Sequence, residues 1–311
     1  MGSEHDECTE PCALECSDSC NLGSAAGLAP IDLTEARTRF EKETTRGVCP
    51  TAHYRMPYYI WGKGAPLVFV HGVADSSDSF LMPISRLSSH FRCIAYNLPS
   101  GQGDRARIRG WTHDDLVRDI WTLLDHLGHK QAYFFGSSFG TTIVLAAMAQ
   151  RPERIPRAVL QGALAHRPLS SRERWLAWLG QFIPGSVGLF RGRERVLRKI
   201  NGAEFEGRPE EIWRYFIERT ARTLIATLAR QALVLDRVDV RPVLPQVKQP
   251  VLLVCGDQDT IVPGQYQDVL LAGLPNSRRV TLQGCGHVPS YTHPEAMAEV
   301  VRQFFTPPAA T

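Results

Sequence analysis

Short apolar runs alternate with longer helical segments through most of this 311-residue chain. The apolar runs predict strands at residues 54–61, 67–70, 93–97, 133–135, 158–161, 251–255 and 279–282. The segments between them predict helices at residues 112–127, 139–150, 265–271 and 294–305. This alternation is typical of a mostly parallel sheet covered by helices on both faces. We therefore predict an α/β fold built on such a sheet.

One long interval breaks the alternation. Residues 164–245 contain no convincing strand but several helical stretches, at residues 172–182, 193–201, 209–219 and 222–235. An all-helical insertion between two strands predicts a cap that lies over one edge of the sheet. The expected organisation is an N-terminal extension at 1–48, a core at 49–163 and 246–311, and an inserted helical cap at 164–245.

The N-terminal extension carries a regular row of cysteines and one short predicted helix. Cys8, Cys12, Cys16 and Cys20 recur every fourth residue in an acidic stretch without Lys or Arg. On a helix they would share one face but span about 18 Å, too far to bind one tetrahedral ion. The stretch is therefore either a polar tail with reduced thiols or a metal or redox site that other contacts complete. A helix is expected from Asp32 to Gly47.

Charge and hydropathy narrow the class of partner. The formal net charge is only +3, with basic residues spread along the chain, so no nucleic-acid partner is expected. No apolar run approaches the roughly 20 residues of a membrane-spanning helix. The N-terminus lacks a basic start followed by an apolar segment, so we expect no ordinary signal peptide and a cytoplasmic protein. The oligomeric state stays open.

The sharpest local motif is Gly136-Ser137-Ser138-Phe139-Gly140, which lies between a predicted strand and a predicted helix. A turn this tight strains its central residue and excludes bulk two positions away on either side. Ser138 has glycine at both of those positions, whereas Ser137 has phenylalanine. The turn also brings Ser138 to a helix N-terminus, which favours developing negative charge.

An acid and a histidine follow this serine in the chain. The strand at 251–255 leads into a loop with Asp257 and Asp259, and the last strand leads into Gly286-His287. The carboxyl ends of parallel strands are where such sheets hold their sites. Since the imidazole of an ordinary histidine titrates near 6.5, it can take a proton from a serine hydroxyl at neutral pH.

Together these motifs resemble the α/β-hydrolase family over roughly residues 50–306. Gly136 to Gly140 is similar to that family's nucleophile elbow. Gly256-x-x-Asp259-x-x-Val262-Pro263 is similar to its acid loop, which selects Asp259 over Asp257. The resemblance implies Ser138 as nucleophile, His287 as base and Asp259 as the group that orients the histidine.

The resemblance also extends to the loop after the strand at 67–70. His71-Gly72 is similar to the family's oxyanion loop, which implies the backbone N–H groups of Val73 and Phe139 as the two donors. His71 is expected to orient this loop, not to catalyse. One departure from the family pattern is Asn97, which stands where relatives often have Asp.

The implied activity is hydrolysis of a carboxylic ester, or a related acyl bond, of a small or medium apolar substrate. No cofactor and no metal are implied. Two alternatives remain: a C–C bond hydrolase acting on a diketone-like substrate, and a ligand-binding receptor or scaffold with slow or no turnover. Simple esters would be turned over rapidly by an esterase but not by a receptor.

The predicted cap begins with a strongly apolar stretch. Trp175, Trp178 and Phe182 are the tentative substrate-pocket residues, flanked by arginines such as Arg172 and Arg191. The stretch is expected to pack on the main domain and line an acyl pocket. The alternative is an interfacial helix that rests on a membrane or lipid droplet.

Overall fold

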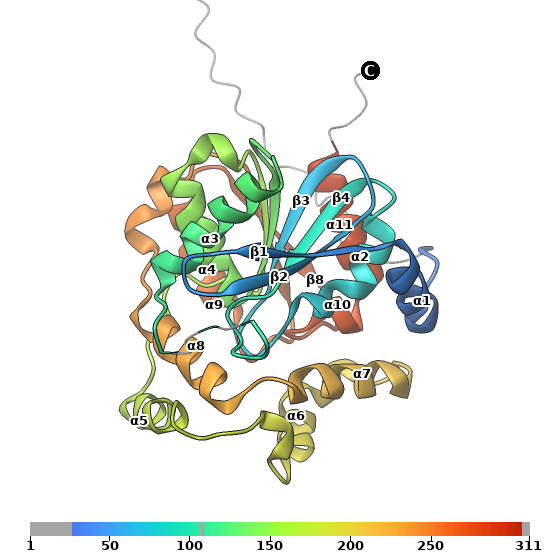
Figure 1. The fold of residues 1–311 in the computed structure, drawn as a ribbon. Coiled ribbons are helices and arrows are strands. Elements are labelled where there is room, and N and C mark those ends of the chain that lie inside the picture. The colour runs from blue at the N-terminus through green and yellow to red at the C-terminus, as the bar shows by residue number, and fades with distance from the viewer. Residues whose placement is uncertain (1–26, 105, 107–108, 307–311) are drawn as a thin grey trace, which may run out of the picture.

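The computed structural model describes residues 27–104, 106 and 109–306 (Figure 1). Cys8, Cys12, Cys16 and Cys20 lie outside the described residues, as does most of the extension. The described chain forms one eight-stranded sheet with helices on both faces. The predicted α/β architecture is therefore confirmed.

The sheet has the strand order β1-β2-β4-β3-β5-β6-β7-β8. Its strands are β1 (Thr45–Pro50), β2 (Arg55–Trp61), β3 (Ala65–Val70), β4 (Phe91–Tyr96), β5 (Tyr133–Ser137), β6 (Ala158–Gln161), β7 (Val251–Gly256) and β8 (Ser277–Leu282). β2 pairs antiparallel with β1 and β4, and all pairs from β4 to β8 are parallel. The carboxyl ends of β3, β5, β7 and β8 therefore meet along one edge.

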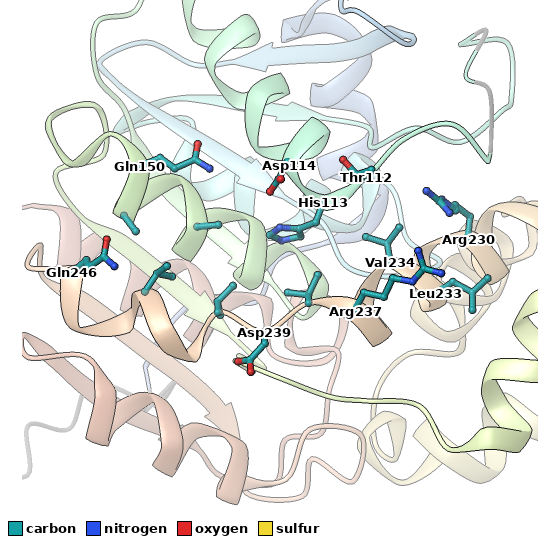
Figure 2. A pocket seen from close by; sticks show the side chains of 15 residues that line it. Thr112, His113, Asp114, Gln150, Arg230, Leu233, Val234, Arg237, Asp239 and Gln246 are labelled. Carbon is teal, nitrogen blue, oxygen red and sulfur yellow. The ribbon is translucent and has the colours of Figure 1, made fainter.

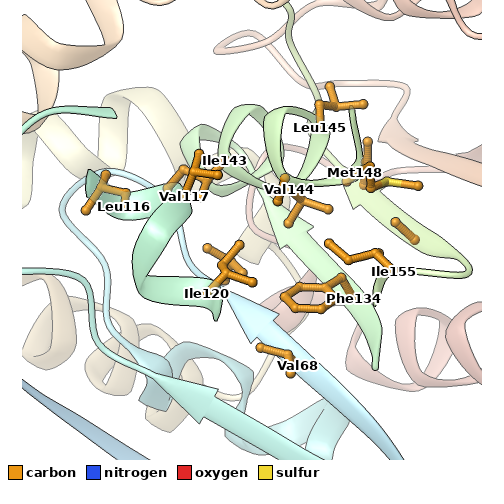
Figure 3. Packing of buried hydrophobic residues seen from close by; sticks show 14 of the residues in the cluster. Val68, Leu116, Val117, Ile120, Phe134, Ile143, Val144, Leu145, Met148 and Ile155 are labelled. Atoms are coloured by element: carbon orange, nitrogen blue, oxygen red, sulfur yellow. The ribbon is translucent and has the colours of Figure 1, made fainter. Parts of the chain in front are cut away.

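Outside the interval between β6 and β7, the helices are α1 (Leu33–Glu43), α2 (Leu81–Leu87), α3 (His113–His126), α4 (Phe139–Gln150), α9 (Gly264–Gly273), α10 (Pro289–Thr292) and α11 (Pro294–Phe305), in the described part of the chain. α3 and α4 pack on one face of the sheet, where their apolar sides meet Val68 and Phe134 (Figure 3). α1, α2 and α11 belong to the apolar cluster on the other face. Burial on both faces explains why inner parallel strands such as β3, β6 and β7 are nearly continuous apolar runs.

Between β6 and β7 the described chain is helical apart from isolated bridges. The segment comprises α5 (Ser171–Gly180), η3 (Val187–Leu189), α6 (Arg193–Asn201), η4 (Gly202–Phe205), α7 (Glu210–Ala221), α8 (Ile225–Arg237) and η5 (Arg241–Gln246). α5 packs against α8. α5, α6 and α7 form a layer beyond the lower end of the sheet in Figure 1. We call residues 164–245 the helical insertion.

The structure corrects the predicted end of the first helix. The sequence predicted a helix from Asp32 to Gly47, but α1 ends at Glu43 and residues Thr45–Pro50 form β1. β1 pairs with β2 in antiparallel register, which the sequence pattern did not predict. Arg46 and Gly47 therefore lie in an edge strand of the sheet. No helix in the described part of the chain has both the length and the apolar character needed to cross a membrane.

Candidate active site

Ser138 occupies the turn between β5 and α4. Its backbone has φ +50° and ψ −119°, a left-handed φ that non-glycine residues seldom adopt. Such strain persists only where the surrounding structure enforces it, and it is common at functional sites. The strand before the turn and the helix after it are both buried, so the serine is held at the strand end by rigid elements.

The flanking glycines are required by close packing. A Cβ on Gly140 would lie 2.8 Å from the carbonyl oxygen of His71 and closer still to that of Val70. A Cβ on Gly136 would lie 3.1 Å from both the carbonyl oxygen of Gly140 and the Cα of Thr141. The start of α4 therefore approaches the end of β3 too closely for a side chain at Gly140, and it leaves little room for one at Gly136.

His287 and Asp259 form a hydrogen-bonded pair. The Nδ1 atom of His287 lies 2.7 Å from Oδ2 of Asp259, which is buried. The other oxygen of Asp259 accepts the backbone N–H groups of Ile261 and Val262 at 2.9 and 2.8 Å. These bonds fix the carboxylate, which in turn orients the imidazole so that its Nε2 is the free ring nitrogen.

Two further polar residues support the histidine loop. Asp257 accepts the N–H of Cys285 at 3.1 Å, so it braces the loop and does not contact His287 itself. Gln161, at the end of β6, donates to the carbonyl oxygen of His287 at 3.1 Å and accepts the Ser137 hydroxyl at 2.6 Å. The sequence reasoning missed Gln161, although a polar residue ending an apolar strand was the available signal.

The loop after β3 lies against Ser138. A Cβ on Gly72 would lie 3.0 Å from the Cβ of Ser138, so glycine permits this approach. Within the described residues, the N–H of Val73 has no protein acceptor. The N–H of Phe139 has none inside α4, because Phe139 is the first residue of that helix. Neither predicted oxyanion donor therefore has a backbone acceptor among the described residues.

His71 holds this loop in place. Its Nε2 atom accepts the N–H of Leu98 at 3.0 Å, and its Nδ1 atom lies 2.8 Å from the carbonyl oxygen of Gly72. Burial lowers the pKa of His71 to about 4. Asn97 accepts the N–H of Ser77 at 2.7 Å, a bond that an Asp could also accept. Asn97 therefore makes the same contact with the Ser77 N–H that an Asp at this position would make.

A cavity of about 730 Å³ connects these groups, within the range of small-molecule sites. Ser138, His287 and Val73 all line it. The rest of its lining is mainly apolar and comes largely from the helical insertion: Ile183, Val187, Phe190, Val196, Leu197, Phe216, Ile225 and Leu228. The serine and the histidine therefore face one largely apolar space.

The predicted pocket residues lie elsewhere. Trp175, Trp178 and Phe182 are not among the residues that line this cavity, and all three side chains are more than half exposed. The reason is that α5 packs on α8 at the side of the insertion, with Gly180 as its buried residue. The prediction that these three residues line the pocket is wrong for this cavity, and the insertion contributes other side chains such as Ile183, Phe216 and Leu228.

Two carboxyl groups near the site were also missed. Asp75 lines the cavity, where burial raises its pKa to about 6, and the hydroxyl of Tyr291 lies 3.4 Å from its Oδ1. Glu204, in η4, accepts the N–H of Val288 at 3.2 Å, and burial raises its pKa to about 7. Glu204 links the helical insertion to the loop that holds His287.

A second hollow of about 570 Å³ lies between α3, α4, α8 and η5 (Figure 2). His113, Arg230 and Arg237 line it, together with Asp114 and Asp239. Burial lowers the pKa of His113 to about 4, and its Nε2 atom lies 3.1 Å from the Thr142 hydroxyl. None of the predicted site residues borders this hollow, so it is separate from the cavity at Ser138.

Comparison with known proteins identifies the fold family and its relatives. The family model described as alpha/beta hydrolase fold matches residues 65–294. Pimeloyl-[acyl-carrier protein] methyl ester esterase of Nitrosomonas europaea is 30% identical over 245 residues, 75% of this chain and 93% of that protein. The hydrolase YugF of Bacillus subtilis is 28% identical over 255 residues, 76% of this chain and 89% of that protein.

Solved structures agree on the fold. The enol-lactonase of Burkholderia xenovorans LB400 superposes with a TM-score of 0.75 at 21% identity, over 83% of this chain and 99% of that one. A thermophilic esterase of Thermogutta terrifontis gives a TM-score of 0.72 at 19% identity, over 84% of this chain and 97% of that one.

Proposed function

This chain belongs to the α/β-hydrolase fold family, and we propose that it is a serine hydrolase that cleaves a carboxylic ester of a small or medium apolar substrate. One observation carries this proposal. Ser138, at a strained strand-to-helix turn, borders the same cavity as His287, whose ring is held by Asp259. A nucleophile and an oriented base on one cavity are the requirement for acyl transfer.

In the proposed mechanism, His287 takes the proton of the Ser138 hydroxyl as its oxygen attacks the ester carbonyl. The N–H groups of Val73 and Phe139 stabilise the oxyanion, where one such donor is typically worth about 3–4 kcal/mol of the barrier. His287 then donates the proton to the departing alcohol. Water, activated by the same histidine, hydrolyses the acyl-enzyme and restores Ser138.

The helical insertion at 164–245 is the proposed cap over a core formed by residues 49–163 and 246–311. Its apolar side chains, such as Val187, Phe216 and Leu228, supply most of the wall opposite Ser138. A wall of this kind favours an alkyl or acyl chain over a charged substrate. The esterase named among the relatives supports ester cleavage as the reaction.

The decisive test is labelling with a fluorophosphonate, followed by intact mass. We expect one adduct on the natural chain and none on Ser138→Ala, because an ordinary serine hydroxyl is too weak a nucleophile to react with the fluorophosphonate, whereas an activated one reacts readily. Ser137→Ala is the matched control, since Ser137 is the neighbouring hydroxyl and bonds to Gln161. It should keep the adduct.

Labelling of Ser138→Ala to the same extent as the natural chain would contradict the proposed nucleophile. No adduct on a folded natural chain would contradict the hydrolase and favour a ligand-binding protein. A panel of esters with increasing acyl length would then measure the depth of the cavity.

A further inference from the structure

The first half of the helical insertion carries many exposed apolar side chains. Nine of the eleven exposed large hydrophobic residues in the described chain lie between residues 175 and 200, and Val48 and Val269 are the other two. We call these nine the apolar rim: Trp175, Leu176, Trp178, Phe182, Ile183, Leu189, Phe190, Val196 and Ile200. Because scattered single residues are usual on protein surfaces, a local cluster of this kind indicates a binding surface.

Part of the apolar rim borders the cavity that contains Ser138. Ile183, Phe190 and Val196 line the cavity and are also 47%, 66% and 52% exposed. Their side chains thus belong both to the wall of the cavity and to the outer surface. An apolar path runs from the rim to Ser138, so whatever covers the rim also controls access to the cavity.

The charge around the rim is strongly positive. From Arg172 to Lys199 the chain has seven Arg or Lys residues and two Glu residues. Both acids already contact arginines, Glu173 at 4.0 Å from Arg167 and Glu194 at 3.2 Å from Arg198.

Further cations around the rim stay exposed. Arg172, Arg191, Arg195 and Lys199 have no ion pair among the residues that the structure describes. The guanidinium of Arg109 lies 4.8 Å from the ring centre of Phe182, which adds a cation beside the apolar surface.

We propose that the apolar rim docks on an anionic lipid surface and turns the mouth of the cavity toward the lipid. Apolar side chains would enter the boundary between headgroups and acyl chains, while the exposed arginines contact the anionic headgroups. Trp175 and Trp178 suit this boundary because indole rings are amphipathic. A protein or a second copy of the chain on the rim would close the cavity mouth, whereas a lipid surface can supply an apolar substrate to it.

The tryptophans provide a direct measurement. Trp175 and Trp178 are 59% and 53% exposed, while the other four, Trp61, Trp111, Trp121 and Trp213, are buried. A blue shift of tryptophan emission on adding vesicles therefore reports the rim. We expect the shift with vesicles of phosphatidylcholine and phosphatidylglycerol in equal parts, and little shift with phosphatidylcholine alone. Binding is measured without turnover, so it is independent of the proposed hydrolase activity.

Vesicle co-sedimentation of variants tests both parts of the surface. Arg191→Glu combined with Arg195→Glu should weaken binding to the anionic vesicles by about tenfold or more, since each cation near such a surface is worth about 1 kcal/mol. Lys63→Glu with Arg278→Glu is the control for net charge, because both cations are exposed and lie near the amino ends of β3 and β8, at the sheet edge opposite Ser138. The control should lose much less affinity.

The apolar part is tested by Trp175→Ser combined with Leu189→Ser, two exposed residues that do not line the cavity. This variant should bind more weakly, whereas Val269→Ser, exposed on α9, should bind as the natural chain does. Circular dichroism and thermal unfolding check that each variant is folded.

Equal binding to both kinds of vesicle, or no loss with either rim variant, would overturn the proposal. A dimer of the natural chain in light scattering that the apolar variant converts to a monomer would assign the rim to a second copy and would also overturn it.

Discussion

The backbone of Ala74 shows how single side chains of the helical insertion hold the loop beside Ser138. Ala74 has φ +60°, a left-handed value that is costly for alanine. Gln231 in α8 accepts its N–H at 2.9 Å, and Thr223 donates its hydroxyl to its carbonyl oxygen at 3.0 Å. Since Val73 precedes Ala74, these two bonds also restrict movement of the segment that carries the Val73 N–H.

We therefore predict that Gln231→Leu lowers kcat for an ester by roughly tenfold with little change in KM, because a displaced oxyanion donor weakens transition-state binding. Gln231 is buried but does not line the cavity, so substrate binding should be preserved. Gln249→Leu is the control, because Gln249 also bonds to backbone carbonyls, those of Met148 and Pro152. Unchanged kcat in Gln231→Leu would contradict the positioning role.

At the scale of elements, the close approach of α4 to the end of β3 positions the serine. Gly140 lies in the first turn of α4, against the carbonyl groups of Val70 and His71. The helix can reach the sheet only because this residue has no side chain. Because α4 packs so closely on β3, Ser138 at the start of α4 lies beside Gly72 in the loop that follows β3.

Gly140→Ala should therefore lower the free energy of unfolding by about 1–3 kcal/mol, the usual cost of overpacking. It should also reduce labelling of Ser138, since α4 must move to relieve the clash. Gly264→Ala is the matched control: Gly264 begins α9 and has open space where a Cβ would lie. Denaturant unfolding measures the stability of both variants. Equal stabilities would contradict the conclusion that α4 packs too closely on β3 for a side chain at Gly140.

At the scale of the whole molecule, the helical insertion is joined to the histidine loop through Glu204. Its carboxyl group is buried against Gly286 and accepts the N–H of Val288. Burial raises its pKa from 4.5 to about 7. The folded chain therefore keeps a proton there over a pH range in which the unfolded chain has released it.

The free energy of unfolding should consequently decrease as pH rises from about 4.5 to about 7, and should then stop responding to this group. Glu204→Gln should remove this decrease, which amounts to no more than ~3 kcal/mol. Glu206→Gln, at an exposed position in the same turn, is the control and should keep it. Chemical denaturation at a series of pH values measures the effect. Parallel pH profiles for the natural chain and Glu204→Gln would contradict it.

The fold and the position of the candidate nucleophile were predictable from the sequence because their signals are local. Buried parallel strands are continuous apolar runs, and β6, α4, α6 and α11 have the predicted bounds. The elbow needs glycines at fixed positions around Ser138, whatever surrounds it. β1 was missed because an edge strand with one exposed face lacks the continuous apolar run that marked the others.

The amino-acid sequence by itself determined the parallel sheet, the helical insertion and the order of Ser138, Asp259 and His287. Only the tertiary structure decided which side chains face the cavity. Trp175 and Trp178 are large aromatic residues, as Phe216 is, but the packing of α5 on α8 turns them outward. The contacts of Gln161, Glu204 and Gln231 join residues distant in sequence, and no local pattern encodes such contacts. The sequence determines which residues are apolar, whereas tertiary packing determines which of them line the cavity and which remain on the surface.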